Sequence, residues 1–383
     1  MDDALTPHEA SVVDRAKAWA AVDVAPVAES WETDRRFAAE AFAAAASAGL
    51  TGLLVPVEQG GEGLGPVALA RVVEEAAAVD LCAAFSLVVH NNLAGALSRR
   101  GPADLKVRYL DDLVSGARLG AFLLTEPGVG SDAAAITTTA RRTATGWVLD
   151  GAKAWVTNAA GADVLSVYAT TDPAGGHRAI AAFVVEADRP GVRPEPTYQL
   201  FGGHGLGTGG FAFEGCEVDD GSLFVAPGEG FRAAMEGIDL ARVLVAAMCC
   251  GMVRTGLETA TAYVADRRAF GKPLADLQAV RFTLADVATD LAAARLLTFR
   301  AARTLQDGVS GAVDAAHAKK FATRAAEARL ADCMQVMGAA GARRDHPLPR
   351  HLATARLTHY LDGATEIQDV VIARSLLGPS ENA

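Results

Sequence analysis

Hydrophobic residues recur at helical intervals along the first third of the chain. From about residue 5 to residue 115 they fall three and four positions apart, and breakers such as Gly49, Gly60 and Gly101 divide them into segments. This spacing predicts several amphipathic helices joined by short turns. We therefore expect an all-helical N-terminal domain over residues 1–117.

The spacing becomes shorter in the middle of the chain. Between residues 119 and 224 threonine and valine are dense, and short apolar runs such as 164–169 replace the helical pattern. The pair Asp150 and Gly151 has the composition of a hairpin turn between two such runs. We expect a middle antiparallel β domain over residues 118–226.

A helical pattern returns after Pro227 and Gly228. Its clearest part is an apolar stripe with intervals of three and four, formed by Leu277, Val280, Leu284, Val287 and Leu291. Such a seam is typical of a helix bundle, so we expect one over residues 227–383. Helices, then strands, then helices predict an α+β fold.

Composition narrows the class of protein. Of the 383 residues 51% are hydrophobic and 21% are charged, as in globular proteins, and the formal charge of -11 disfavours nucleic acid as a partner. Residues 1–4 lack the basic segment of a secretory signal, and the apolar run 41–57 is interrupted by Gly49 and Gly52. We expect a cytoplasmic protein without a membrane span. The five cysteines have no CxxC spacing, which predicts reduced, mostly buried thiols and neither disulfides nor a zinc site.

Two segments of the β region carry residue types that suit a flavin. Residues 124–132, LTEPGVGSD, form a loop whose amides and Ser131 hydroxyl can face an anion, although a plain Pro-Gly turn explains them too. Residues 153–158, KAWVTN, are expected to form a strand with Trp155 and Thr157 on one face. That face can offer a ring and a hydroxyl to an isoalloxazine, or can simply be part of a β core.

A third motif lies at the end of a predicted helix. Residues 267–274, RRAFGKPL, place Arg267 near Phe270, and this pair can contact a phosphate and a ring. Basic residues that complement a helix dipole before a Gly-Pro ending explain the segment equally well.

Taken together, the motifs resemble those of the acyl-CoA dehydrogenase family of flavoproteins over essentially the entire chain. Residues 335–338, QVMG, and the tail 363–368, GATEIQ, agree with that family in order and spacing. The resemblance implies a C-terminal four-helix bundle after the two other domains, with FAD between the β domain and the C-terminal helices. It also implies a homodimer or homotetramer, in which the neighbouring subunit supplies part of each FAD site.

The resemblance assigns roles to individual positions. The residues expected around the flavin ring, ribityl chain and pyrophosphate are Phe122, Thr125, Ser131, Trp155 and Thr157. Those expected to reach the adenine half of FAD are Arg267, Phe270, Gln335, Gly338 and Glu366. Those expected to contact the substrate are Ser131, Arg242 and Gly363. We expect Arg242 near the start of a helix, where the helix dipole disfavours a cation and a partner is needed.

Asp362 is the expected catalytic base. The family's usual tail reads Tyr-Glu-Gly-Thr, and this chain has Leu361, Asp362, Gly363 and Ala364 instead. The shorter carboxylate favours a short, branched or cyclic acyl group. An alternative role for Asp362 is to cap the N-terminus of the last helix.

These features predict an FAD-dependent acyl-CoA dehydrogenase, which removes the α-proton and β-hydride of an acyl thioester. The acyl group can be carried by coenzyme A or by a carrier protein, and an electron-transfer flavoprotein can take the electrons. Two alternatives stay open. One is a flavin oxidase or monooxygenase on the same fold, since nitroalkane oxidases resemble this chain in using aspartate as the base. The other is a catalytically inactive homologue that binds flavin or acyl groups.

Overall fold

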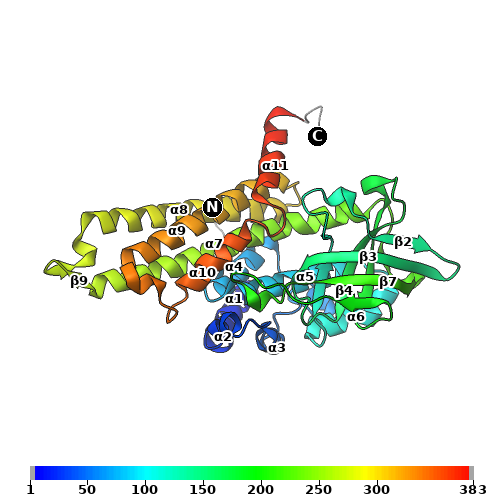
Figure 1. Cartoon of the computed structure of the whole chain (residues 1–383), viewed down its shortest axis with the longest axis horizontal. Coiled ribbons are helices and arrows are strands. Elements are labelled where there is room, and N and C mark those ends of the chain that lie inside the picture. The colour runs from blue at the N-terminus through cyan, green and yellow to red at the C-terminus, as the bar shows by residue number, and fades with distance from the viewer. Residues whose placement is uncertain (1–4, 379–383) are drawn as a thin grey trace.

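Three regions of different secondary structure follow one another along residues 5–378, the part of the chain that the computed structural model describes. Helices come first, a β sheet follows, and long helices come last, as the sequence predicts (Figure 1). The α+β class is therefore confirmed. The expectation drawn from residues 1–4 lies outside the described residues.

The N-terminal region is built from helices with clear local start signals. Thr6 caps the first helix in a capping box with Glu9, and Asp80 accepts hydrogen bonds from the first amides of the fifth. The helices are α1 (Pro7–Trp19), α2 (Ala28–Thr33), α3 (Ala39–Ser47), α4 (Pro66–Ala77), α5 (Leu81–Arg100) and α6 (Ala103–Ser115). Most of α5 is buried, because it packs against the sheet as well as against other helices.

The middle region is one mixed sheet in the strand order β6-β7-β3-β2-β4-β5-β8, with β1 paired to β4. The strands are β1 (Gly120–Leu123), β2 (Thr139–Arg142), β3 (Gly146–Val156), β4 (Val164–Thr170), β5 (Ile180–Glu186), β6 (Val192–Pro194), β7 (Gly209–Asp219) and β8 (Leu223–Val225). Most pairs are antiparallel, but β1 and β2 each pair with β4 in parallel. The prediction of a purely antiparallel domain is wrong for these pairs, because the intervening chain lets a strand return in the same direction.

The hairpin turn predicted at Asp150 and Gly151 is also wrong. Both residues lie inside β3, where the register with β7 shifts between Leu149 and Gly151. Gly151 has a φ of 145°, and a Cβ there would lie 2.7 Å from Thr138. Glycine therefore lets the strand continue through a bulge in close contact with its neighbour.

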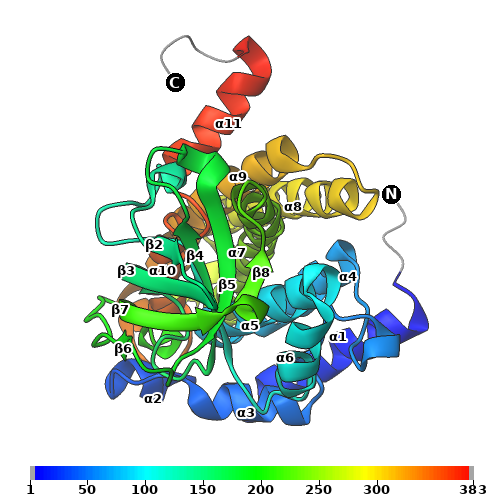
Figure 2. The same ribbon diagram turned by 90° about the vertical axis from the view of Figure 1, so that its right-hand side faces the viewer.

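The C-terminal region is a bundle in which α7 (Gly230–Asp266), α8 (Gln278–Gln306) and α9 (Ala312–Met337) pack side by side. Figure 2 looks along these helices from the sheet end. Val287 of the predicted stripe is buried, and Leu284 and Leu291 pack against the same core. The remaining elements are the hairpin β9 (Arg268–Ala269) and β10 (Lys272–Pro273), and the helices α10 (Leu348–Thr358) and α11 (Thr365–Leu377).

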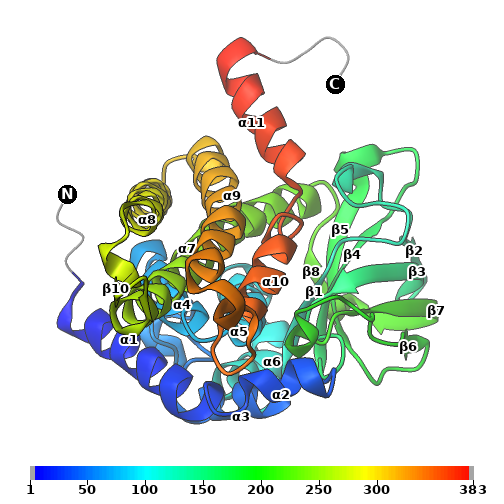
Figure 3. The same ribbon diagram turned by 60° about the vertical axis from the view of Figure 1, so that its left-hand side comes forward.

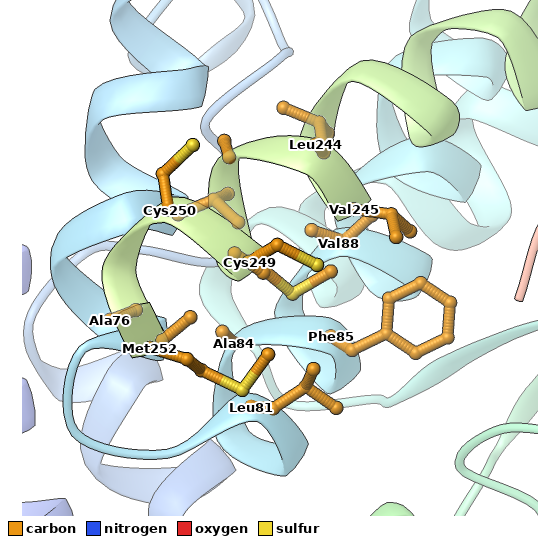
Figure 4. Packing of buried hydrophobic residues seen from close by; sticks show 14 of the residues in the cluster. Ala76, Leu81, Ala84, Phe85, Val88, Leu244, Val245, Cys249, Cys250 and Met252 are labelled. Carbon is orange, nitrogen blue, oxygen red and sulfur yellow. The ribbon is translucent and has the colours of Figure 1, made fainter. Parts of the chain in front are cut away.

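Helices α5 and α7 meet in the centre of the core, where Phe85 and Val88 lie close to Val245 and Cys249 (Figure 4). Both helices are long and apolar enough to cross a membrane, but 89% and 78% of their most apolar windows are buried. Packing inside the protein thus accounts for their composition. All five cysteines are free thiols and all are buried, one step beyond the prediction that most of them would be.

Candidate active site

The loop between α10 and α11 holds Asp362 in an unusual backbone conformation. Its φ is 50°, and that of Gly363 is 96°, so two successive residues are left-handed. Helix α11 begins only at Thr365 and has Ala364 as its N-cap. The alternative in which Asp362 caps this helix is therefore wrong.

Side chains from three helices hold the backbone of this loop. Arg242 Nε of α7 donates to the Asp362 carbonyl at 3.1 Å. Lys319 Nζ of α9 donates to the Gly363 carbonyl at 2.8 Å, and Gln368 Nε2 of α11 donates to the same oxygen at 3.1 Å. The position of Asp362 is thus fixed through the main chain.

The carboxylate of Asp362 is itself without a hydrogen-bond donor among the described residues. Its Oδ2 atom is buried and unpartnered. Burial raises the pKa of this carboxyl from 3.8 to about 6, although the charges of Lys319 and Arg242 act to lower it. A buried carboxylate with a raised pKa and a free oxygen can accept a proton from a bound molecule.

Arg242 lies inside α7 rather than at its start, because the helix begins at Gly230. The predicted position is wrong, but the expected partner is present: Arg242 Nη1 and Asp239 Oδ1 are 2.9 Å apart. Arg242 is only 7% exposed, so burial of the guanidinium, and not the helix dipole, explains the need for acceptors.

A buried ion pair ties the loop 124–132 to β3. Glu126 accepts hydrogen bonds from Lys153 Nζ at 2.8 Å and from the Thr138 amide at 2.8 Å. Burial alone would raise the pKa of Glu126, but Lys153 and the other donors lower it to about 2. Glu126 therefore belongs to the scaffold of the loop, while Ser131 stays exposed at its surface.

Trp155 lies beside this loop. The amide of Ala154 donates to the Thr125 carbonyl at 2.9 Å, which makes Trp155 and Thr125 neighbours. The indole is 60% exposed, whereas Thr157 is buried. The two side chains do not share one face of a strand as expected. The backbone at Trp155 is left-handed with a φ of 57°, and β3 ends before Thr157. Phe122, on β1, is half-buried.

The residues expected around the adenine half of FAD lie far from this loop in a single chain. Arg267 and Phe270 belong to the β9–β10 region, at the opposite end of the molecule from the sheet (Figure 1). Gln335 and Gly338 are at the end of α9, and both are exposed. Phe270 is 92% exposed, and its φ is 53°. Within one chain, the structure does not bring this group to the loop 124–132.

Only part of the predicted set therefore meets at Asp362. Arg242 contacts the loop, Gly363 is part of it, and Glu366 is exposed on the first turn of α11. Lys319 and Gln368 were not predicted as site residues. Lys319 had a visible signal, because it occupies the same helical face as Ala315 and Ala322, and that face is buried.

Among residues 5–378 no cluster of three or more His, Cys, Asp or Glu side chains is arranged to hold a metal ion. Helix α10 and the start of α11 lie on the side of the bundle nearest the β domain (Figure 3). The loop of Asp362 thus belongs to the junction of the two domains.

Comparison with known proteins assigns the whole chain to one family. The models of the acyl-CoA dehydrogenase N-terminal, middle and C-terminal domains match residues 6–117, 121–216 and 228–377. The human mitochondrial short-chain specific acyl-CoA dehydrogenase is 37% identical over 353 residues, which are 92% of this chain and 86% of that protein.

Solved structures agree with this result. Butyryl-CoA dehydrogenase from Megasphaera elsdenii is 32% identical, with a TM-score of 0.95 over 98% of this chain and 100% of that one. The FAD complex of PigA is 27% identical, with a TM-score of 0.94 over 99% of this chain and 100% of that one. The chain therefore belongs to the acyl-CoA dehydrogenase family.

Proposed function

We propose that this chain is an FAD-dependent acyl-CoA dehydrogenase that oxidises an acyl thioester to its 2,3-enoyl thioester. The observation that carries the proposal is the half-buried carboxylate of Asp362, whose Oδ2 atom is buried and unpartnered, on a loop held by three helices. The short-chain and butyryl-CoA enzymes among the similar proteins support a thioester substrate.

Exposed groups on the β domain suit one half of FAD. Trp155 presents a largely exposed ring, and Ser131 and Thr125 supply hydroxyls beside it. Gly128 and Gly130 are exposed and a Cβ on either would meet no atom within 4 Å, so the loop is open to the approach of a phosphate at both positions. Phe122 and Thr157 complete the proposed flavin side of the site.

The other half of the proposed site comes from a second copy of the chain. Arg267, Phe270, Gln335 and Gly338 are exposed, yet they lie away from the flavin side of their own chain. A homodimer, or a homotetramer made of two such dimers, would bring the two halves together. Glu366 is proposed to help with the adenylate.

A variant of Arg267 tests the shared site. Arg267→Ala should lower FAD retention, since a charge-assisted contact to the pyrophosphate is lost. Lys272→Ala, an exposed change in the same hairpin, is the control and should retain FAD. Full FAD retention by a monomeric Arg267→Ala protein would contradict the proposal.

The chemistry assigned to the chain is removal of a proton. The Cα–H bond of the thioester breaks and its proton passes to Asp362, while the electron pair forms the Cα–Cβ double bond and a hydride leaves Cβ. When bound, FAD supplies the acceptor for that hydride. The Asp362 amide has no acceptor among the described residues and can donate to the thioester carbonyl as negative charge develops there. Ser131 and Gly363 are proposed to contact the substrate, and Arg242 to act through the loop.

Asp362→Asn is the direct test of this function. Asparagine has a similar size and tolerates a positive φ, so folding and FAD content should be retained. Asparagine cannot accept the α-proton, so reduction of the bound flavin by butyryl-CoA should slow by about 10² or more. A rate near that of the unchanged protein would rule out Asp362 as the base.

Aspartate at the base position also favours a second candidate, a flavin oxidase on the same fold. The two differ in their electron acceptor. The dehydrogenase should reduce an electron-transfer flavoprotein or a dye quickly and oxygen slowly, whereas an oxidase should release hydrogen peroxide at a rate close to its turnover.

We propose a cytoplasmic location, since the two long apolar helices are mostly buried inside the protein. Fractionation of cells that express the chain would test this location. Recovery in the membrane fraction after a salt wash would contradict it.

A further inference from the structure

We propose that Lys319 is the residue that positions Asp362 for proton removal, because its ammonium group holds the carbonyl of the following residue, Gly363, and that of His359 at the start of the loop. The inference rests on the proposed role of Asp362 as the base. It adds a residue on α9 to the machinery that the sequence motifs define.

The Lys319 ammonium group is buried and has only a few hydrogen-bond acceptors among the described residues. The side chain is 0% exposed, so water is excluded and the charge must be compensated within the protein. Its Nζ donates to the Gly363 carbonyl at 2.8 Å and to the His359 carbonyl at 3.4 Å. Among the described residues no carboxylate forms an ion pair with it. Lys319 therefore directs its charge to the backbone of a single loop.

The loop needs such a clamp. Left-handed backbone is unfavourable for a residue with a side chain, and it persists where the surrounding structure holds it. Arg242 holds the carbonyl of Asp362 from α7, while Lys319 holds the next carbonyl from α9. Among the described residues no hydrogen-bond donor contacts the Asp362 carboxylate directly. The orientation of the carboxylate is therefore set by the backbone that Arg242 and Lys319 hold.

Charged and titratable groups from every helix around the loop face this site. The charged ones are Arg242 and Asp239 on α7, Lys319 and Glu327 on α9, and Glu366 on α11; burial keeps the titratable groups of Cys249 on α7 and His359 after α10 neutral by raising the pKa of the thiol and lowering that of the imidazole. Burial raises the pKa of Asp362, and Lys319 is the leading group that acts to lower it. Loss of the Lys319 charge should therefore raise this pKa further and leave less of the base ionised at neutral pH.

Lys319→Met tests the assignment, because methionine has similar length and leaves no buried charge behind. The neighbouring Lys320 is a matched control: it is partly exposed and forms an ion pair with Asp369 of α11. In the FAD-loaded protein, Lys319→Met should slow flavin reduction by butyryl-CoA about 10-fold or more, with little change in thioester affinity. When the rate of flavin reduction is plotted against pH, its fall at acidic pH should occur about one pH unit higher in Lys319→Met than in the unchanged protein. Lys320→Met should change neither the rate nor its dependence on pH.

A second readout does not depend on the flavin. The infrared band of the protonated Asp362 carboxyl is identified by its absence from Asp362→Asn, and its titration should move to higher pH in Lys319→Met. Lys319→Arg keeps a positive charge and should restore the lower pKa at least in part.

Unchanged rate and titration in a folded Lys319→Met protein would overturn the positioning role alone, provided that Asp362→Asn is inactive. Retained activity in Asp362→Asn would overturn the proposed function together with this inference. If Lys319→Met does not fold, Lys319→Gln, which keeps a donor without the charge, takes its place. Failure of both variants to fold would show a purely structural role and would also overturn the inference.

Discussion

The ionised carboxylate of Asp362 should destabilise the folded protein. Burial raises the pKa of this group from 3.8 to about 6, so the folded chain holds the proton more tightly than the unfolded chain. The protonated Asp362 carboxyl therefore contributes a stability that is fully present below pH 3.8 and is lost as the pH rises through about 6.

The two pKa values set the size of this effect. They differ by about two units, and each unit corresponds to about 1.4 kcal/mol, which gives a penalty of up to about 3 kcal/mol. Asp362→Asn removes the ionisable group and suits the φ of 50°. The variant should be more stable than the unchanged protein by up to about 3 kcal/mol at pH 8 and nearly equal to it at pH 4.

Urea unfolding of both proteins at pH 4, 6 and 8, with matched FAD content, measures this difference. Asp369→Asn is the control. The Asp369 carboxylate is exposed and pairs with Lys320, so removal of its charge should not stabilise the protein at pH 8. A stability difference between Asp362→Asn and the unchanged protein that stays constant from pH 4 to pH 8 would refute the reasoning.

Three further outcomes are expected. Lys153→Met should cost about 3–5 kcal/mol in urea unfolding, because it strands the buried Glu126 carboxylate, and adding Glu126→Gln should recover part of the loss. Additive losses would contradict this coupling. Trp155→Ala should change the free energy of unfolding by less than about 1 kcal/mol, since the ring is 60% exposed, yet should shift the flavin spectrum and slow its reduction. Phe270→Ala should leave secondary structure intact while sedimentation reports weaker assembly and the protein loses FAD; unaltered assembly would count against the proposed interface.

Local patterns account for the elements that could be predicted. The stripe through Leu284, Val287 and Leu291 encodes a buried helical face, because spacing alone decides which side chains share that face. The parallel pairing of Gly120 with Val164 is different, since it joins residues far apart in sequence and leaves no local signal. The bulge at Gly151 resembles a turn in composition, and only its contact with Thr138 distinguishes the two.

Some features of the candidate site could likewise be predicted from the sequence, and others could not. Motif resemblance named Arg242 as a substrate contact at the start of a helix, but it did not predict the hydrogen bond of Arg242 to the Asp362 carbonyl or the position of Arg242 inside α7. The capping role failed because the left-handed backbone at Asp362 and Gly363 precedes the helix start at Thr365. Lys319 was not predicted: its spacing from Ala315 and Ala322 places it on an apolar helical face, but the spacing does not show that its ammonium group contacts the Gly363 carbonyl.

The separation of the two groups of proposed FAD residues has a genetic consequence. If each site draws Trp155 from one chain and Arg267 from another, a chain defective at Trp155 and a chain defective at Arg267 can complement each other. In a mixed dimer one site would combine both defects, and the other would combine both intact halves. Two alleles that are inactive alone would then restore activity when they are expressed together.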